Sequence, residues 1–472
     1  MNVTANDVIM AELVSLALEE LRNSEDMASY QTAAMSAVNQ ALTLATQTAL
    51  EIYDNELYQT KDKEMISKGK EKRELLELFG EMTFCRRRYT YKGRNIYLLD
   101  EVLGFPSNTA FSASVIRFLA MHARTDAYES ATEDLKELSG TKVSRSSVKA
   151  AIAATADALR RQTKESSSVK KKVPFIDIES DDIVVPRQRT KKQKEQDRCL
   201  GRDKDKAKVT LTVVKGYEGK ERTGFGKRKR CLNSFFITGA LGTEEAFERT
   251  CDYLEKHYDT SCISHVHFGS DTASNQRIGR DILPKKVIDS VDTYHAFRKL
   301  EKLLEADVKK EIVKSLYKEE YQNIYEILIN AFEFYKETKQ YTLAENLCEA
   351  AGYLNRNAEA IVKGLKHSLG TIEGANAHIV KDRCKGRGRS WSLEGADNIT
   401  VLNAAYAQKI AFPYIGRKQC LPRLAQVIEQ SKTSIITDVK QHKVQLSGNH
   451  YYHQTKLIDC ERTKGTNTSS LA

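Results

Sequence analysis

Two acidic residues in this 472-residue chain close predicted strands, and a third lies on a predicted helix. Asp181 closes a strand predicted over 173–178, in FIDIESDDIVV, and Asp271 closes a strand predicted over 263–268, in HVHFGSD. Glu373 follows much later, on a helix. Because ligands gather beyond the strand ends of an open α/β sheet, the carboxylates of Asp181 and Asp271 can converge on one crevice.

Carboxylates grouped in this way suit Mg²⁺ or Mn²⁺, whose oxygen ligands leave coordination positions open for water and phosphate. Two such ions about 3.5–4 Å apart activate an attacking oxygen and stabilise the leaving oxygen of a phosphodiester. We therefore expect Asp181, Asp271 and Glu373 to be catalytic residues that bind two metal ions. This chemistry requires no covalent intermediate with the protein.

The identity of the first acidic ligand stays open. Asp177, Glu179 and Asp181 alternate along the strand and so share one face of it, and Asp182 follows directly. Glu179 and Asp182 are therefore alternatives to Asp181. An isolated acid at a strand end is more often solvated or a helix cap than a ligand, and the separations along the chain prove nothing by themselves.

Positive charge is clustered in the chain, which favours DNA as a partner. Lys and Arg number 74 and Asp and Glu 64, a formal net charge of +10, although the first 30 residues are acidic. Residues 187–208 carry ten Lys or Arg against four acids, and residues 215–230 carry seven against two. A phosphate backbone attracts clustered cations through the release of counterions.

The chain divides into seven predicted regions. Apolar residues at helical spacing predict helices up to residue 58, followed by a charged connector over 61–72. A β-hairpin turning at Lys92-Gly93 comes next, and its adjacent arginines, Arg86 to Arg88, predict one basic, solvated side. The regions are a helical N-terminus (1–74), the β-hairpin (75–112), a helix-turn-helix (113–164), the first part of a core (173–299), a helical insertion (300–367), the second part of the core (368–431) and a polar tail (432–472).

A helix-turn-helix that binds DNA is predicted within 113–164. An apolar-periodic helix ends at Leu138, a Gly-containing turn follows, and Ser144 can cap the next helix. The inward positions of that second helix are Val148, Ala151 and Ile152. Its exposed positions, the candidates for contacts with phosphates and base edges, are Arg145, Ser146, Ser147 and Lys149.

The elements after residue 173 come in the order β-β-β-α-β-α-β. That order predicts an α/β fold: an RNase H-like, mixed-sheet catalytic core with helices on both faces. A strongly helical stretch without strand signals interrupts the core over 300–367 as an all-α insertion. The helical N-terminus, the β-hairpin and the helix-turn-helix all precede this core.

Four motifs resemble those of the ISLre-type insertion-sequence transposases, a family also described as an uncharacterised bacterial protein family. IESDD is similar to the family's Ile-Glu-Ala-Asp-Glu element and points to Asp181, and GSDTA followed by ILP marks Asp271. DTYH, from Asp292 to His295, is similar to an Asp-x-Phe-His element of several transposase groups. TIEGANAHIVKDRCKGRGRSWS is similar to a Glu-Gly-x-x-x-His helix followed by a basic stretch and Trp-Ser, and it marks Glu373.

This resemblance spans residues 75–410, with one departure: Ile183-Val184 stand where the family commonly has a His. It implies a DDE-type transposase that cleaves DNA strands and transfers them to a new site. The implied partners are double-stranded DNA, both the element's terminal repeats and the target, and further copies of the chain on that DNA. A structure-selective nuclease of the same fold and a non-catalytic, transposase-derived DNA-binding protein are the alternatives.

Other residues are candidates for supporting roles. Asn376 shares a helical face with Glu373 and, with Asp292 and His295, is expected to orient the acidic ligands or the substrate. A basic segment with two glycines is expected to form a loop that grips a DNA strand, and the only tryptophan can stack on an unpaired base or anchor a core. These DNA-binding candidates are Lys381, Arg383, Arg387, Arg389 and Trp391.

Cysteine use and hydropathy indicate the compartment. The nine cysteines form no CxxC pair, which disfavours a zinc ribbon and indicates free thiols in a reducing environment. No apolar run approaches the roughly 18 residues of a membrane span, and no secretory signal is recognisable. We expect a soluble cytoplasmic protein, associated with the nucleoid and not with a membrane.

Overall fold

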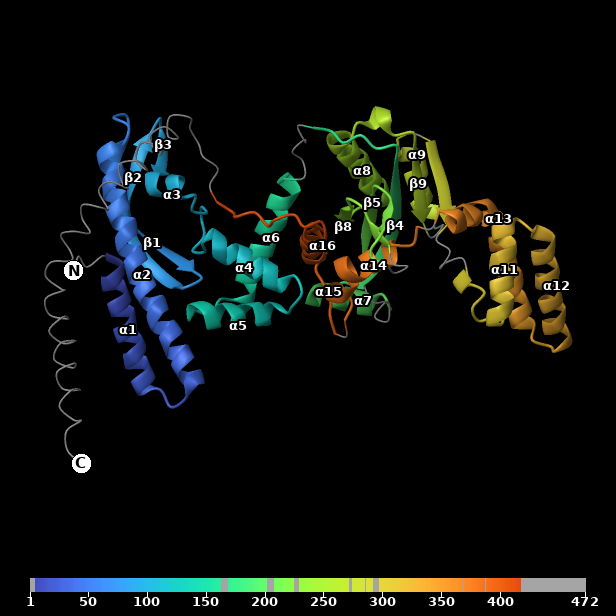
Figure 1. Cartoon of the computed structure of the whole chain (residues 1–472), viewed down its shortest axis with the longest axis horizontal. Coiled ribbons are helices and arrows are strands. Elements are labelled where there is room, and N and C mark those ends of the chain that lie inside the picture. Colours follow the sequence, from blue (N-terminus) through green and yellow to red (C-terminus); the bar gives the residue numbers. More distant parts are fainter. Residues whose placement is uncertain are drawn as a thin grey trace. The chain divides into compact units, whose positions relative to one another are not determined.

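The chain separates into two compact units, which are described in turn (Figure 1). This computed structural model describes residues 5–162, 169–201, 208–224, 229–270, 274–284, 286–291, 297–367, 369–386 and 388–416. Of these, the first unit contains 5–119, 129–145 and 414–416, and the second contains the rest. Several predictions lie outside the described residues, namely those for Asp271, Asp292, His295, Arg387 and the tail over 432–472.

Two long helices begin the first unit, where helices were predicted: α1 (Ala5–Asn23) and α2 (Met27–Thr60). Asp26 caps α2, because its carboxylate accepts a hydrogen bond from the Ser29 N–H at 2.8 Å. The cap satisfies an amide that has no partner within the helix. Buried side chains of α2 then pack into one core with the sheet that follows.

That sheet is antiparallel, in the order β1 (Ile66–Glu77), β2 (Gly80–Tyr91) and β3 (Arg94–Tyr97). The predicted turn between β2 and β3 is confirmed: Lys92 and Gly93 have φ values of +49° and +76°. Positive φ at both residues is what a two-residue hairpin turn requires.

The prediction of a charged connector over 61–72 is wrong, because the strand β1 begins at Ile66 and the helical N-terminus ends at Thr60. The alternation of β1 is hard to recognise because one of its buried positions is a charged residue, Arg73. Arg73 donates to the buried Asp100 at 2.5 Å and to the Pro106 carbonyl at 2.8 Å.

The three adjacent arginines of the hairpin, which were predicted to make one side basic and solvated, are paired with acids. Each of them is at least half-buried. The ion pairs are Arg86–Asp100 at 2.7 Å, Arg87–Asp54 at 2.7 Å and Arg88–Glu71 at 2.8 Å. Asp100, on α3 (Leu98–Leu103), therefore holds two buried guanidinium groups.

Three helices carry the chain from the first unit into the second: α4 (Ala113–Ala123), α5 (Tyr128–Ser139) and α6 (Arg145–Gln162). Gly140 follows α5 with a φ of +72°, the left-handed conformation that commonly ends a helix. The helix, Gly-containing turn and helix are thus present, and α5 ends one residue after the predicted Leu138. The predicted inward residues of α6, Val148, Ala151 and Ile152, are buried.

The second unit is built on a five-stranded mixed sheet (Figure 1). Its order is β10 (Lys286–Val291), β9 (His265–Ser270), β4 (Phe175–Pro186), β5 (Lys208–Tyr217) and β8 (Phe235–Gly239). The first three strands are parallel, whereas β5 is antiparallel to both β4 and β8. A small hairpin of β6 (Lys220–Arg222) and β7 (Lys229–Cys231) leaves the end of β5.

β4 is twice as long as predicted, and this corrects the setting of Asp181. β9 pairs with β4 only up to Glu179, while β5 pairs with it up to Pro186. Asp181 therefore lies within β4, just past its pairing with β9, and does not close the strand. The error arose because the sequence DDIVVP keeps its strand pairing with β5 despite the two acids.

The two faces of β4 meet different partners. Ile176 and Ile178 pack on one face into a core with α8 (Thr243–His257), while Asp177, Glu179 and Asp181 occupy the other face. α9 (Ser274–Ile282) lies with α8, a short 3₁₀ turn (Thr260–Cys262) joins α8 to β9, and the exposed α7 (Lys191–Cys199) follows β4.

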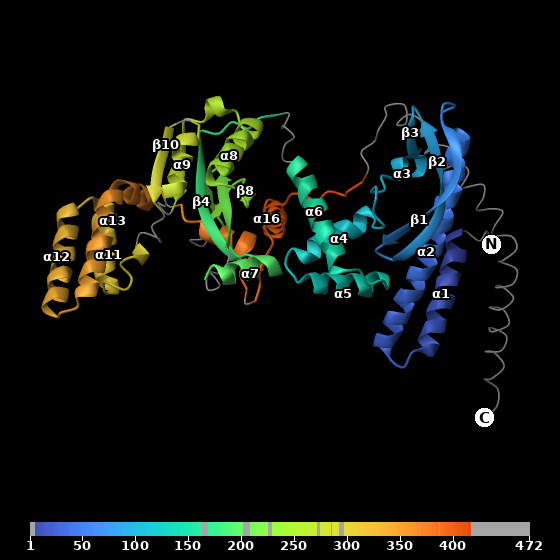
Figure 2. The same ribbon diagram turned by 180° about the vertical axis from the view of Figure 1, so that it is seen from behind.

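Helices make up the predicted insertion over 300–367: α11 (Ala306–Lys318), α12 (Tyr321–Glu337) and α13 (Tyr341–Lys366). They share one core, and α13 packs against β10 (Figure 2). The chain then forms α14 (Ile372–Asn376), a π-helical turn (Ala377–Lys381), α15 (Asp382–Cys384) and α16 (Leu393–Ala407). Among the helices that the structure describes, none is long and apolar enough to cross a membrane.

Candidate functional site

The polar face of β4 positions the helix that carries Glu373. Glu179 is 1% exposed, and its carboxylate accepts hydrogen bonds from the Thr371 N–H at 2.8 Å and the Ile372 N–H at 3.1 Å. The Thr371 hydroxyl at 2.6 Å and the Tyr217 hydroxyl at 2.8 Å complete its partners. Glu179 thus satisfies the amides at the start of α14, which carry partial positive charge.

These contacts argue against Glu179 as a metal ligand, which is one of the alternatives that the sequence left open. Four donors occupy the two oxygens of Glu179, so a metal ion would have to displace the contacts that hold α14 in place. Glu179 is a structural acid, and its contacts explain why a helix as short as α14 is ordered at this position.

Replacing Thr371 with valine is expected to lower the free energy of unfolding by about 2 kcal/mol, because hydrogen bonds to charged groups contribute about 1.5–3 kcal/mol. The valine removes the hydroxyl that donates to Glu179 and accepts from the Lys215 ammonium at 2.8 Å. Urea unfolding followed by fluorescence of the only tryptophan, Trp391, measures the effect in the second unit. Thr338→Val, at an exposed helix end, is the matched control, and an equal effect of both changes would contradict the role of Thr371.

Asp181 lies two residues after Glu179 on the same face of β4, and it also contacts α14. Its Oδ2 accepts from the Asn376 side-chain amide at 2.6 Å, and its Oδ1 accepts from the Asp182 N–H at 2.9 Å. Asn376 is fully buried, and its Oδ1 has no hydrogen-bond partner among the described residues. Asn376 thus orients the carboxylate of Asp181, while its predicted role beside a metal ligand stays a prediction.

Glu373 lies one helical turn before Asn376, so both project from the same side of α14. Its Oε2 accepts from the Lys381 ammonium at 2.7 Å, and both side chains are about one-third exposed, 38% and 35%. Lys381 ends the π-helical turn, a widened helical turn that is often found at functional sites. Asn376 thereby joins Asp181 to the helix of Glu373, whose side chain is accessible to solvent.

Asp182 lies on the other face of β4 from Asp181, as the alternation of a strand dictates. Its Oδ1 accepts from the Thr212 hydroxyl at 2.7 Å. The Thr212 hydroxyl also lies 3.2 Å from the Leu241 carbonyl. Asp181 therefore contacts α14 through Asn376, whereas Asp182 contacts Thr212 of β5.

The predicted DNA-binding residues of α6 are at its exposed N-terminal end. Arg145, Ser146 and Lys149 are exposed and Ser147 is half-buried. Arg145 forms an ion pair with Glu129, and Lys149 lies 3.6 Å from Glu394. Such exposed pairs contribute at most about 1 kcal/mol and exchange readily for other partners.

The predicted DNA-gripping loop is partly a packed structure, which corrects two residues. Arg383 is 6% exposed, donates to the Ala123 carbonyl at 3.2 Å and stacks 4.7 Å from the Trp391 ring. Trp391 is 7% exposed and bonds through its backbone to Pro186 and Gln188. Neither side chain presents a surface to DNA, because the tertiary fold buries both.

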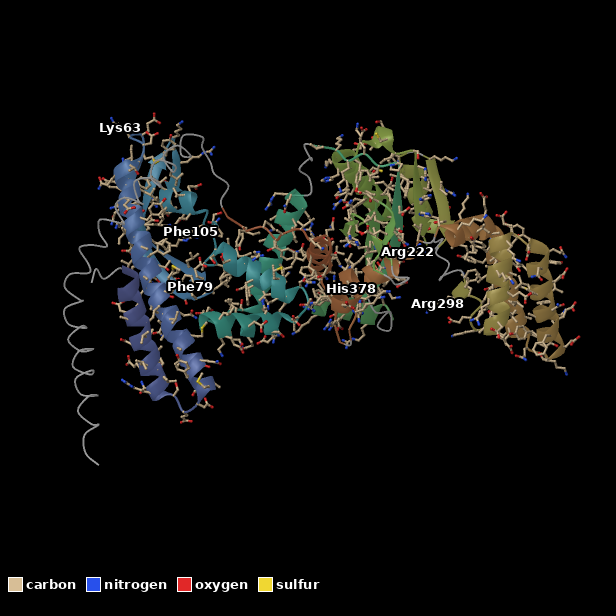
Figure 3. The ribbon with its side chains drawn as sticks, in the orientation of Figure 1. Lys63, Phe79, Phe105, Arg222, Arg298 and His378 are labelled. Atoms are coloured by element: carbon tan, nitrogen blue, oxygen red, sulfur yellow. The ribbon has the colours of Figure 1, made fainter. Side chains whose placement is uncertain are left out.

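The remaining residues of that segment differ in the contacts that their side chains make. Arg389 is exposed, but its guanidinium donates to the carbonyls of Asp382 and Arg383, both at 2.9 Å, and so closes the loop on itself. His378, labelled in Figure 3, lies on the π-helical turn with a mostly exposed side chain that contacts Asp382 at 3.2 Å. Of the predicted basic set on described residues, Lys381 alone pairs with an acid of the candidate site.

Alkylation is expected to spare Cys384 in the folded chain, because burial raises the pKa of its thiol to about 12. At pH 8 only about one thiol in ten thousand is then the reactive thiolate. Exposed Cys199 and Cys262 are expected to react with iodoacetamide under the same conditions. Mass spectrometry of the peptides measures this, with urea-unfolded chain as the control, and reaction of Cys384 at the rate of Cys199 would contradict the packing around it.

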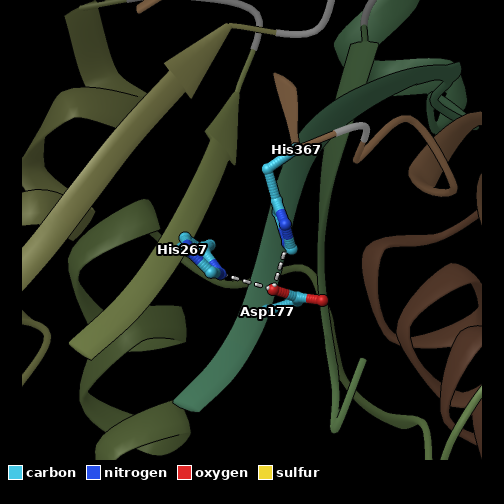
Figure 4. Close-up of side chains that lie close together, drawn as sticks. All are labelled: Asp177, His267 and His367. Atoms are coloured by element: carbon cyan, nitrogen blue, oxygen red, sulfur yellow. Dashed lines mark hydrogen bonds and ion pairs between the residues drawn. The ribbon is translucent and has the colours of Figure 1, made fainter. Parts of the chain in front are cut away.

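A second polar group on β4 was not predicted. Asp177 is 1% exposed, and its Oδ1 lies 2.9 Å from His267 Nδ1 and 2.9 Å from His367 Nε2 (Figure 4). The sequence holds half of the signal, because Asp177 and His267 are direct partners in the parallel pairing of β4 with β9. His367, at the end of α13, comes from 190 residues away and carries no local signal.

Comparison with known proteins identifies relatives along most of the chain. Residues 26–413 match the model of "Uncharacterised protein family (UPF0236)". A protein of Streptococcus gallolyticus described as "UPF0236 protein in vanSb 3'region" is 25% identical over 404 residues, which cover 82% of this chain and 84% of that protein. The matched region includes the sheet, the insertion and the helix of Glu373, and the chain belongs to this uncharacterised family, UPF0236.

Proposed function

We propose that the chain is a DDE-type DNA transposase in which Asp181, Asp271 and Glu373 bind two Mg²⁺ or Mn²⁺ ions. The observation that carries the proposal is the contact between Asn376 and Asp181, which brings the helix of Glu373 to the polar face of β4. An acid of the central strand thus contacts the helix that carries a second acid, 192 residues later in the chain.

The topology of the sheet supports an RNase H-like core. Three strands in sequence, β4, β5 and β8, form an antiparallel half, and β9 and β10 then add in parallel beside β4. Helices lie on both faces, and the all-α insertion falls between β10 and α14. These are the features that the sequence pattern predicted for that fold.

The register of the parallel strands supports the choice of Asp271. Glu179 of β4 is paired with Gly269 of β9. In the sequence, Asp181 and Asp271 each come two residues after a member of this pair. Asp271 directly follows Ser270, the last residue of β9, in the sequence.

The donor set suits a hard divalent ion, because carboxylate and amide oxygens are the ligands that Mg²⁺ prefers. The buried Asn376 Oδ1, which lacks a partner among the described residues, is a further oxygen at this place. Bound ions would supply activation of the attacking oxygen and charge neutralisation at the leaving oxygen. Asn376 holds the Asp181 carboxylate in one orientation, and Lys381 offsets the charge of Glu373 and is exposed enough to meet a phosphate.

Positive surface near the sheet offers a path for the DNA. α7 has no buried residue and carries Lys191, Lys192, Lys194 and Arg198 directly after β4. The exposed end of α6 supplies the DNA-reading side chains in this proposal, and phosphate contacts by α7 position the duplex. Because two element ends are cut, we propose that at least two copies of the chain assemble on the DNA.

Labelled duplexes from both borders of the element that encodes this chain test the proposal. With Mg²⁺ and unlabelled target DNA, we expect cleaved ends and, later, products in which a labelled end is joined to the target. Cleavage without joining would identify a structure-selective nuclease instead. Metal-independent, sequence-specific binding without cleavage would identify a DNA-binding protein.

A further inference from the structure

Three side chains of types that bind metal ions lie together on the polar face of β4, outside the proposed catalytic site. Asp177 belongs to β4, His267 to β9, and His367 caps the end of α13. One potential ligand atom from each residue lies within 4.8 Å of both others. Figure 4 shows both imidazoles pointing at the same carboxylate oxygen.

The geometry suits a tetrahedral transition-metal ion. Zinc lies about 2.0–2.1 Å from nitrogen and oxygen ligands, so its ligand atoms are about 3.3 Å apart. The two nitrogen–oxygen distances are now 2.9 Å. An opening of about half an ångström, small for side chains, would place an ion between the three atoms.

The surroundings of the group suit a metal ion. The rings of His267 and His367 lie 3.9 Å apart, tilted by 31° to one another. Neutral imidazoles are the form that binds metals. Phe175 packs edge-on against both rings and shields one side of the group, as the apolar shell of a metal site does.

We propose that Asp177, His267 and His367 form a second metal site, which binds one Zn²⁺ and leaves its fourth position for water. Two imidazoles and one carboxylate match the ligand preference of Zn²⁺, whereas Mg²⁺ prefers oxygen ligands alone. His367 is 42% exposed, so the fourth position is open to solvent.

The site is separate from the catalytic carboxylates. Asp177 and Asp181 are four residues apart on one strand, a separation of about 13 Å at roughly 3.3 Å per residue. Two ions that act on one phosphate are only about 3.5–4 Å apart. The proposed zinc ion would join the end of α13, in the helical insertion, to the strands β4 and β9. Its ligand His367 comes shortly before α14 in the chain.

Zinc titration of the full-length, chelator-stripped chain in excess Mg²⁺ tests the site. Calorimetry is expected to give one Zn²⁺ per chain, and Co²⁺ in its place is expected to give the visible absorption of a tetrahedral ion with nitrogen ligands. Asp177→Asn, His267→Gln and His367→Gln are each expected to weaken binding at least tenfold, since even residues that only orient ligands contribute about 10–100-fold. His378→Gln, on an exposed histidine outside the group, is the matched control and is expected to bind as the parent does.

Asp181→Asn separates this inference from the proposed function, because it removes a catalytic carboxylate and is expected to keep the zinc affinity. Zinc is also expected to raise the melting temperature of the parent and of Asp181→Asn, but not of His267→Gln. Loss of binding in Asp181→Asn with retention in His267→Gln would assign the zinc to the carboxylates and overturn the proposal. Absence of zinc and cobalt binding in the folded parent would overturn it as well and leave a hydrogen-bonded cluster only.

Discussion

Replacing Asp181 with asparagine is expected to lower the rate of Mg²⁺-dependent strand transfer by about a hundredfold to a thousandfold. The change keeps the size of the side chain but removes the charge that is proposed to bind the ion, and one well-placed charged or polar group contributes about 10²–10³ to a rate. The amide of Asn376, which donates to Asp181 at 2.6 Å, keeps an oxygen acceptor in the variant, so the fold is preserved. DNA binding is expected to be no weaker. Gel assays of joined products and of bound duplex measure both.

Asp182→Asn is the matched control, because the same chemical change is then made one residue away on the other face of β4. It leaves the contact between Asn376 and Asp181 in place and is expected to retain strand transfer. The same loss as in Asp181→Asn is expected for Asp271→Asn and Glu373→Gln. Full activity in any of these three variants would remove that residue from the catalytic set.

Replacing Asp100 with alanine is expected to destabilise the first unit by about 3–5 kcal/mol, the usual effect of removing one partner from a buried ion pair. Asp100 is fully buried and binds both Arg73 at 2.5 Å and Arg86 at 2.7 Å. The alanine strands two guanidinium groups away from water. Hydrogen exchange of the amides of β1 and β2 measures the change in opening free energy, because these strands carry the two arginines.

Glu71→Ala provides the comparison in the same sheet. Glu71 pairs with Arg88 at 2.8 Å, but both side chains are 38% exposed, so water replaces the lost partner. Its effect is expected to stay below about 1 kcal/mol. Similar changes in exchange for Asp100→Ala and Glu71→Ala would show that burial does not govern these pairs.

The sequence predicted those parts of the fold that depend on local periodicity. The strands β4, β5, β8, β9 and β10 and the helices between them follow from alternation and helical spacing, because each buries one face. Asn376 was predicted from its position one turn after Glu373, since the geometry of a helix requires the two to share a side. The turn at Lys92-Gly93 followed from the preference of Gly for positive φ.

Contacts between distant segments account for the errors. Arg and Trp side chains commonly contact DNA, so Arg383 and Trp391 were predicted to do so. Their burial, however, depends on how the segment after α14 packs. The sequence left Glu179 as an alternative metal ligand, because its hydrogen-bond donors could not be predicted. Three of its four donor groups belong to residues more than 190 positions away. Local patterns contain no information about such partners, and a charged residue such as Arg73 in a buried strand position hides even the alternation.

The capping of α14 by Glu179 sets the order in which the chain can assemble during synthesis. Thr371 follows Glu179 by 192 residues, and ribosomes add about 5–20 residues per second, so the cap forms at least about 10–40 s after its strand has been made. An isolated helix of five residues is not stable, so Glu373 has no fixed position before that moment. A nascent chain can therefore present α6, the helix proposed to read DNA, well before it holds a complete set of the proposed acids.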